Sequence, residues 1–236
     1  MLRFSARETE ALEIMDDPEC DPAALERTYA HFALVNRLVA GWGRVYRRQI
    51  FPLARRGPVS VLDLGSGGGD LARALATWAR RDGISLAVTA VDPDPRAHEF
   101  ASRNGRGTPV GYECASSTDL VEEGRRFDVV VSNHVLHHLD EVTLAGFLAD
   151  SLLLARTRVL HSDIARSLPA YAAYWAATRL TFPGSFIHAD GLLSIRRSYR
   201  PQELAAAAPT PWHVERPWPA RLLLAASGAG RASARA

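Results

Sequence analysis

Residues 61–71, with the sequence VLDLGSGGGDL, combine an acid with four closely spaced glycines. Asp63 stands inside a short apolar run, and glycines follow at positions 65, 67, 68 and 69. Glycine has no Cβ atom, so it adopts a positive φ and lets a ligand lie against the backbone. An apolar helical pattern comes next, and a helix N-terminus offers free N–H groups and the positive end of a dipole. A strand, a glycine turn and a helix in this order predict a nucleotide pocket at the carboxyl end of a parallel strand.

The spacing of the glycines indicates which nucleotide this pocket takes. A dinucleotide-binding loop has the pattern G-x-G-x-x-G, whereas Asp63, Gly65, Gly67 and Gly69 follow one another at every second position. This pattern resembles the first motif of the class I S-adenosylmethionine (SAM) dependent methyltransferases. The acid inside the strand suits a ligand that carries an ammonium and a sulfonium instead of a pyrophosphate. The resemblance implies that these four residues and Ser66 bind SAM.

Two later strand ends extend the resemblance to the ribose and to the methionine end of the cofactor. Asp92 follows the apolar run 86–91 and lies 23 residues after Gly69. An acid at that place accepts hydrogen bonds from both ribose hydroxyls, as in dinucleotide folds. Asn133 follows the apolar run 127–131, and its amide both donates and accepts hydrogen bonds. We therefore expect Asp92 to bind the ribose, and Asn133 to hold either the methionine end of SAM or the substrate.

The adenine contact departs from the family pattern. The family often has an acid just after the third strand, predicted here at 110–114, but Cys114 occupies that position. Either the backbone of the next two residues contacts the adenine, or Glu113 does so if the register differs by one. The residues expected beside the adenine and the ribose are Pro93, Cys114, Ala115 and Ser116.

Histidines supply the candidates for proton transfer. Methyl transfer to a phenol is helped by a base that removes the hydroxyl proton, and histidine titrates in the right range. His188 is the first candidate, since it lies where this fold usually adds substrate-facing structure, and His137 and His134 come next. If His188 is the base, its replacement by alanine lowers turnover about a hundredfold with SAM affinity intact. No second ligand cluster accompanies the histidines near position 134, so we expect no metal site.

Alternating strand and helix patterns predict an α/β fold. Parallel strands are expected at 61–64, 86–91, 110–114, 127–131 and 157–164, and a last antiparallel hairpin at 212–215 and 221–225. The fold class is a Rossmann-like doubly wound sheet, mostly parallel, with an N-terminal helical cap. The domain boundaries are a cap or lid over 1–56, a core over 57–226 with a substrate-facing insertion at about 165–200, and a disordered tail over 227–236. A lid and a simple packing pair are equally compatible with the helices of the cap.

Composition indicates a globular protein and excludes several classes. The chain has 236 residues, 47% apolar and 23% charged, and all 28 basic residues are arginine. The formal charge of +2 and the lack of a basic stripe argue against nucleic acid as a partner. Two distant cysteines indicate a reducing cytoplasm rather than a disulfide framework. The N-terminus is too acidic for a signal peptide, and no apolar run is long enough for a membrane span.

The segments around positions 137 and 163 suggest the acceptor class. The sequence VLHHLD at 135–140 resembles the motif after strand four in ubiquinone- and menaquinone-type methyltransferases. The segment 163–199 resembles a bacterial subgroup near them, whose members are implied to methylate small phenolic, quinone-like or polyketide-derived acceptors. O-methylation in secondary metabolism is the leading hypothesis, with a homodimer as a further expectation. The alternatives are C-methylation of a quinone-like ring, an NAD-linked oxidoreductase and a catalytically silent SAM-binding protein.

Overall fold

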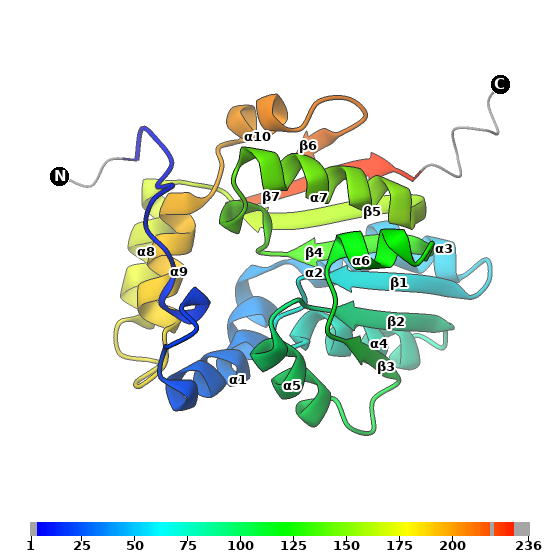
Figure 1. Ribbon diagram of the computed structural model, residues 1–236, viewed down its shortest axis with the longest axis horizontal. Coiled ribbons are helices and arrows are strands. Elements are labelled where there is room, and N and C mark those ends of the chain that lie inside the picture. The colour runs from blue at the N-terminus through cyan, green and yellow to red at the C-terminus, as the bar shows by residue number, and fades with distance from the viewer. Residues whose placement is uncertain (1–3, 218–219, 229–236) are drawn as a thin grey trace.

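Seven strands form a single sheet in the order β3-β2-β1-β4-β5-β7-β6 (Figure 1). The computed structural model describes residues 4–217 and 220–228, except for the side chains of residues 38 and 39. The first five strands pair in parallel, and β7 runs antiparallel between β5 and β6. The predicted fold class is therefore confirmed, including the last hairpin. The strands are β1 (Val59–Leu64), β2 (Leu86–Val91), β3 (Val110–Glu113), β4 (Phe127–Asn133), β5 (Ala155–Ile164), β6 (His213–Glu215) and β7 (Arg221–Ser227).

Helices cover both faces of the sheet and the end to which the parallel strands point (Figure 1). In Figure 1, the N-terminal segment, α1, α8 and α9 lie beyond the carboxyl ends of β1, β4 and β5. The helices are α1 (Pro22–Val39), α2 (Trp42–Val45), α3 (Phe51–Ala54), α4 (Asp70–Arg81), α5 (Pro95–Asn104), α6 (Ser117–Glu122), α7 (Glu141–Leu154), α8 (Leu168–Thr178), α9 (Ile187–Arg197) and α10 (Pro201–Ala207). Shorter turns are η1 (Ile14–Asp16), the π-helical η2 (Tyr46–Ile50) and η3 (Leu136–His138).

The central strands are apolar on both faces because each face packs against helices. Val61 belongs to a core with Leu75 of α4, whereas its neighbour Leu62 belongs to a second core with Leu120 of α6. Successive side chains of a strand point to opposite faces, so the continuous apolar run of β1 fills both cores. A fully buried leucine or valine contributes about 1.5–3 kcal/mol relative to an exposed one, so these cores fix the strand ends that carry the site.

The N-terminal helices are part of this packing. Trp42, Tyr46 and Ile50 are buried in the same core as Val61 and Leu75. The boundary at residue 56 stays a prediction, but no gap in packing separates residues 42–50 from the sheet.

One helix differs from expectation. Helix α9 was not predicted, because its polar residues obscure the spacing of the buried residues Ile187 and Ile195.

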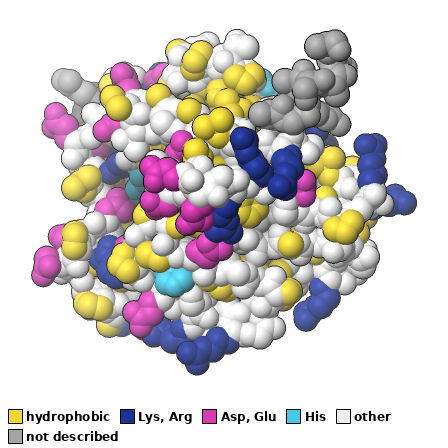
Figure 2. Space-filling view, turned by 45° about the vertical axis from the view of Figure 1, so that its right-hand side comes forward, with side chains coloured by type: hydrophobic (Ala, Val, Ile, Leu, Met, Phe, Trp, Pro, Cys, Tyr) yellow, Lys and Arg dark blue, Asp and Glu magenta, His cyan; other side chains and the backbone are white. Residues whose placement is uncertain are grey.

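The C-terminal end of the chain also differs from expectation. Ser227 belongs to β7 and pairs with Arg158 of β5, so the predicted disordered tail does not begin there. Gly228 also belongs to that predicted tail, and its N–H donates a 3.0 Å hydrogen bond to the carbonyl oxygen of Thr157. Residues 229–236 lie outside the described residues. Among the described residues, no helix is both long and apolar enough to cross a membrane. On the face in Figure 2, the described arginines stand apart, with acidic side chains among them, instead of forming a stripe.

Candidate functional site

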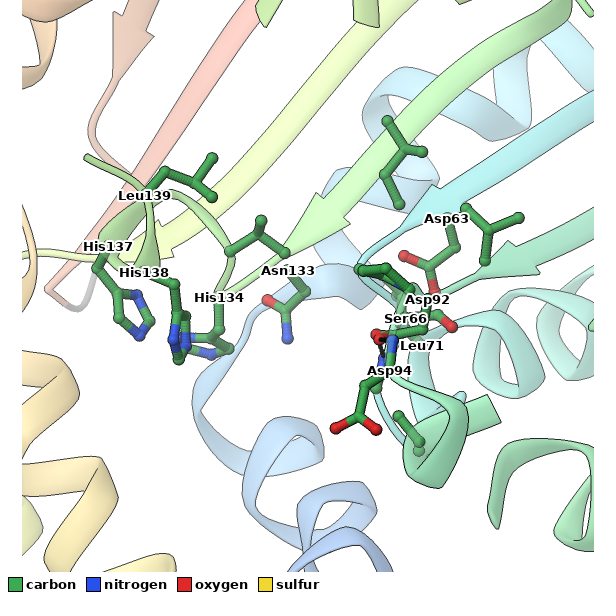
Figure 3. Close-up of a pocket in the computed structure, with 18 of the residues that line it drawn as sticks. Asp63, Ser66, Leu71, Asp92, Asp94, Asn133, His134, His137, His138 and Leu139 are labelled. Carbon is green, nitrogen blue, oxygen red and sulfur yellow. Dashed lines mark hydrogen bonds between the residues drawn. The ribbon is translucent and has the colours of Figure 1, made fainter. Parts of the chain in front are cut away.

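A cavity of about 720 Å³ opens at the carboxyl ends of β1, β2 and β4. Carboxylates at the ends of β1 and β2 lie on one side of it in Figure 3, and histidines from the loop after β4 lie on the other. Asn133 lies between the two groups (Figure 3). Helix α1, the N-terminal segment and helices α8 and α9 contribute further lining residues, which include Tyr29, Phe32, Glu13, Tyr174 and Ser194.

The glycine loop after β1 needs glycine for two different reasons. Gly65, Gly67 and Gly69 have φ angles of 65°, 52° and 74°, a region that side chains with a Cβ rarely adopt. A Cβ at Gly65 would also lie 2.7 Å from Cγ2 of Val135, whereas a Cβ at Gly67 would meet nothing within 4 Å. Gly67 therefore offers open space where a ligand lies against the backbone. Gly69 is not among the cavity-lining residues and caps α4 instead.

Asp63 presents a buried carboxylate oxygen that has no hydrogen-bond partner among the described residues. The residue is 1% exposed and lines the cavity, and Oδ2 is the unpartnered atom. Burial raises the pKa of Asp63 well above its usual value, and repulsion by Asp70 and Asp92 raises it further. Burial also raises the pKa of Asp70, although Asn36 of α1 donates a 3.0 Å hydrogen bond to it. A cationic ligand relieves this repulsion, so the site fits the ammonium and sulfonium of the expected SAM.

Asp92 holds the glycine loop from the neighbouring strand. Its Oδ2 accepts a 2.7 Å hydrogen bond from the Gly67 N–H, and its Oδ1 accepts a 3.0 Å bond from the Asp94 N–H. Burial raises the pKa of Asp92. Each carboxylate oxygen keeps a further lone pair, and the residue lines the cavity together with Pro93. The position suits a pair of ribose hydroxyls, and ribose binding by Asp92 stays a prediction.

The expected adenine contacts divide into two groups. Ala115 and Ser116 line the cavity, and Ser116 caps α6 through reciprocal hydrogen bonds with Asp119. Cys114 does not line the cavity: its side chain is exposed, and its Sγ is 3.8 Å from the carbonyl oxygen of Pro93. The alternative, Glu113, is paired with Arg125. The geometry therefore favours the backbone beside Ala115 and Ser116 over either of these side chains.

Asn133 is held from two sides at the end of β4. Its Oδ1 accepts hydrogen bonds from Trp42 Nε1 at 2.9 Å and from Arg221 Nη2 at 3.2 Å. Both partners come from segments far away in sequence, and neither was predicted as a site residue. Because the Asn133 oxygen is occupied, the amide NH₂ group is left to donate to a ligand in the cavity.

His134 lines the cavity but its ring is already engaged. Its backbone has a φ of 61°, and Arg221 Nη1 lies 3.1 Å from its Nε2. Arginine is always a donor, so Nε2 accepts and Nδ1, 3.7 Å from Asp163 Oδ1, carries the proton. Burial and the nearby Arg221 charge lower the pKa of His134 to about 4. His134 is therefore a neutral ring, and the lone pair on its Nε2 accepts the hydrogen bond from Arg221.

His137 lies between two carboxylates and is almost fully buried. Its Nδ1 is 2.8 Å from Asp163 Oδ1, its backbone N–H donates to Asp163 Oδ2 at 3.0 Å, and its Nε2 is 3.4 Å from Glu13 Oε1. Burial alone lowers the pKa of His137, but Asp163 and Glu13 outweigh it and raise that pKa to about 10. Burial likewise raises the pKa of Glu13, yet His137 and His138 bring it down to about 2. The cluster is therefore charged near neutral pH.

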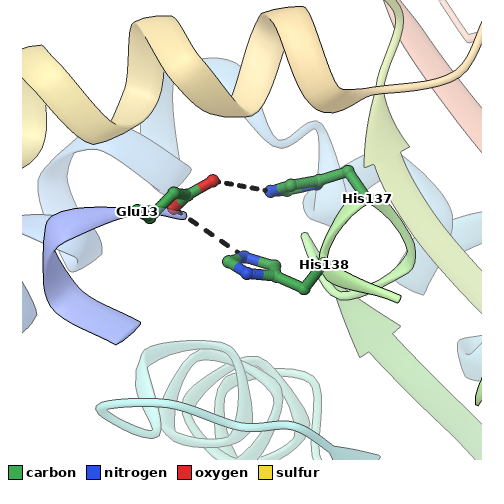
Figure 4. Close-up of side chains that lie close together, drawn as sticks. All are labelled: Glu13, His137 and His138. Atoms are coloured by element: carbon green, nitrogen blue, oxygen red, sulfur yellow. Dashed lines mark ion pairs between the residues drawn. The ribbon is translucent and has the colours of Figure 1, made fainter. Parts of the chain in front are cut away.

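Glu13 also faces His138, whose Nε2 lies 3.8 Å from its Oε2 (Figure 4). The two histidines and Glu13 place possible ligand atoms within 4.8 Å of one another, and so do His134, His137 and Asp163. The expectation of no metal assumed that no second ligand group lies nearby, and Glu13 is such a group. That premise was wrong, whereas the absence of a metal stays a prediction.

His188, the first candidate for a base, lies elsewhere. It stands on α9 with its Nδ1 2.8 Å from Thr178 Oγ1 of α8, and it is not among the cavity-lining residues. The helix turns this side chain toward α8, while Gly191 and Ser194 of the same helix line the cavity. The geometry therefore gives no support to proton transfer by His188. The residues that sequence reasoning missed are Glu13, Trp42, Asp70 and Arg221; Asp163 carried one signal, its place at a strand end.

Known proteins resemble this chain in sequence and in fold. Residues 61–156 match the family model described as "Methyltransferase domain". The ubiquinone biosynthesis O-methyltransferase of Methylocella silvestris is 31% identical over 179 residues, which are 70% of this chain and 63% of that protein. The protein of the same name from Rhizobium etli is 36% identical over 84 residues, 35% of this chain and 32% of that protein. The chain thus covers less than two thirds of the length of these relatives, 63% of one and 32% of the other.

Two solved structures share the fold at low sequence identity. The mitomycin 7-O-methyltransferase MmcR superposes with a TM-score of 0.64 at 19% identity, over 93% of this chain and 62% of that one. The plantazolicin methyltransferase BpumL, in complex with a monoazolic desmethylPZN analog and SAH, gives 0.58 at 12% identity, over 88% and 97%. Together these matches confirm the predicted resemblance to the class I methyltransferases and to their ubiquinone-biosynthesis group.

Proposed function

We propose that this chain, which carries a methyltransferase domain, transfers the methyl group of SAM to a small-molecule acceptor by O-methylation of a phenolic or polyketide-derived compound. The observation that carries the proposal is the unpartnered, buried oxygen of Asp63 beside Asp70 and Asp92. Three carboxylates at one end of a cavity favour a cationic nucleoside over a dinucleotide, whose pyrophosphate is negatively charged. Three of the four similar proteins named above are O-methyltransferases by name, which supports oxygen as the acceptor atom.

The residues of this chain bind and orient the cofactor, because the chemistry needs little more than alignment. Bound SAM supplies a methyl group on a positively charged sulfur, which is already a strong electrophile. Asp63 and Asp70 hold the cationic end, and Asp92 holds the ribose. Fixing two reactants in line converts a bimolecular step into an effectively unimolecular one.

We assign to His137 the role of accepting the proton from the acceptor's hydroxyl group. His134 lies beside it, and His188 is given no role in proton transfer. Asp163 binds the Nδ1–H of His137, so the neutral ring carries its lone pair on Nε2, on the side of Glu13. The pKa of about 10 is close to that of a phenol, so the proton moves between groups of similar affinity. A cation bound nearby lowers the pKa of His137, which increases the fraction of the ring that is able to accept the proton.

The setting of the enzyme is also part of the proposal. We place it in the bacterial cytoplasm and in secondary metabolism, since both cysteines are free and far apart in sequence. A homodimer is supported by exposed apolar residues on and after α8: Leu168, Trp175 and Leu180. Light scattering of the purified chain at two concentrations tests the dimer, and a mass of one chain at both concentrations contradicts it.

Calorimetric titration with S-adenosylhomocysteine (SAH), with NADH as the control ligand, tests the cofactor assignment. We expect SAH to bind at micromolar concentration, NADH not to bind, and Asp92→Ala to weaken SAH binding. A phenol and quinone panel with mass detection of methylated products then tests the reaction. Binding of NADH alone contradicts the assignment, and SAH binding without transfer to any acceptor favours a catalytically silent SAM-binding protein.

A further inference from the structure

The N-terminal strap, residues 8–17, forms one wall of the cavity because helix α9 holds it there. Asp190 of α9 accepts hydrogen bonds from the backbone N–H groups of Ile14 at 2.8 Å and Met15 at 3.0 Å. Arg197 of α9 donates a 2.7 Å hydrogen bond to the carbonyl oxygen of Ala11. These contacts hold the backbone of the strap on both sides of Glu13. The side chain of Glu13 is therefore held in the cavity wall beside His137.

Glu13 is buried and ionised at the side of the cavity that lies away from Asp63 and Asp92. It is 3% exposed and lines the cavity. Ser194 of α9 donates a 2.8 Å hydrogen bond to its Oε1, and the ion pairs with His137 and His138 keep its pKa at about 2. Two carboxylates, Glu13 and Asp163, flank the imidazolium of His137.

The described lining of the cavity offers an anion few positively charged partners. Among the described residues that line it there is no arginine, and the chain has no lysine. Nearby arginines are directed to other partners: Arg197 donates to carbonyl oxygens of 11, 137 and 138, and Arg221 to His134, Asn133 and Ser162. The carboxylates that line the cavity are Glu13, Asp16, Asp63, Asp70, Asp92, Asp94 and Asp150.

Apolar side chains complete the acceptor side of the cavity. Residues that line it near the histidines and the strap include Met15, Leu139 and Phe147. Such walls suit an aromatic ring. A negatively charged substituent on that ring loses its water on entering. Among the described lining residues, the positive partner that it meets is His137, which Glu13 and Asp163 already flank.

We infer that Glu13, held in place by the N-terminal strap, makes this site select against phenolic acceptors that carry an anionic group. The inference rests on the proposed methyl transfer and adds to it the charge of the acceptor and the residue that selects it. Glu13 acts on an anionic acceptor through charge repulsion, and His137, whose Nε2 lies 3.4 Å from Glu13 Oε1, acts on the acceptor hydroxyl.

Three catechols of similar size provide the test. The probes are 3,4-dihydroxyphenethyl alcohol, which is neutral, 3,4-dihydroxyphenethylamine, a cation, and 3,4-dihydroxyphenylacetate, an anion. For the wild-type chain we expect kcat/KM for the anion to be at least about tenfold below that for the neutral probe, since like charges a few ångströms apart repel strongly in a buried site. The cation is expected to react at least as well as the neutral probe.

The Glu13→Gln variant assigns the selectivity to this residue. Glutamine keeps the size of the side chain and an oxygen for the Ser194 hydrogen bond, so we expect the ratio of anion to neutral probe to rise about tenfold. Glu10→Gln, on the exposed part of the strap, is the matched control and leaves the ratio unchanged. SAH titration of each variant reports whether the cofactor site is intact.

Each outcome decides between the inference and the proposed function. Equal kcat/KM for anion and neutral probe in the wild-type chain overturns the inference and leaves methyl transfer standing. Selectivity that survives Glu13→Gln, with SAH binding intact, overturns the role of Glu13. No transfer to any of the three probes, despite SAH binding, counts against phenolic acceptors and overturns the proposed function together with the inference.

Discussion

Replacing Asp163 by asparagine tests whether the buried pair with His137 stabilises the fold as an ion pair. The carboxylate accepts three hydrogen bonds, from the backbone N–H groups of His137 and Ile164 and from the His137 ring. Asparagine has the same shape but only one oxygen, so its NH₂ group faces at least one buried donor. Leaving a buried donor unpaired costs about 1–3 kcal/mol, and removing one partner of a buried ion pair costs about 3–5 kcal/mol.

We therefore expect Asp163→Asn to lower the free energy of unfolding by about 3 kcal/mol at pH 7. The pKa of His137 is raised to about 10 in the folded chain, above its value of about 6.5 in an unfolded one. Its contribution to stability is therefore complete below pH 6.5 and is lost as the pH rises through 10. The difference between wild type and variant should shrink to about 1 kcal/mol above pH 10, where only the unpaired donor remains.

Urea-induced unfolding followed by circular dichroism at pH 7 and at pH 10.5 measures both quantities. Asp140→Asn is the matched control: Asp140 caps α7 by accepting a hydrogen bond from the Thr143 N–H, and asparagine caps a helix equally well. The control should change stability little at either pH. A loss below about 1 kcal/mol at pH 7, or a loss of equal size at both pH values, would refute the ion pair.

The remaining predictions concern the cofactor, the acceptor proton and the metal. Asp63→Asn should weaken SAH binding about tenfold or more by calorimetry, because an amide NH₂ repels the ammonium; unchanged affinity places that ammonium elsewhere. Turnover should rise with pH from 7 to 9, because His137 accepts a proton only when neutral and its pKa is raised to about 10; a flat profile removes it from proton transfer. His188→Ala should keep turnover within about threefold, since the ring contacts Thr178; a hundredfold loss would restore the first hypothesis. EDTA should not affect transfer, because both ring nitrogens of protonated His137 face carboxylates; a loss that added Zn²⁺ or Mg²⁺ restores would contradict this.

Local chemistry explains why the sequence predicted the cofactor side of the site. Gly65, Gly67 and Gly69 have positive φ angles. Each angle is a requirement on a single residue, so the positions of the glycines in the sequence indicate where the backbone adopts it. Asp92 follows a strand whose apolar run is readable, and parallel strands end at the same edge of the sheet. The confirmed fold class depends on the same signals, namely apolar strand runs, intervening helices and turn residues.

The acceptor side was less predictable because it is assembled from distant segments. His137 is paired with Glu13 and Asp163, which lie 124 residues before it and 26 residues after it in sequence. A carboxylate in a polar N-terminal stretch looks the same whether it is solvated or buried against a histidine. The sequence thus suggested three histidines with His188 first, and their packing changed that order in favour of His137.

What the sequence determined by itself is the alternation of strands and helices, the glycine loop and the acids at two strand ends, because these depend on backbone geometry within short segments. The tertiary structure decided which ionisable groups meet. It buried His137 between two carboxylates, engaged the lone pair of His134 with Arg221, and turned His188 toward Thr178. The pKa of a side chain and its access to a ligand depend on groups within a few ångströms in space, and neighbours in space are set by the fold.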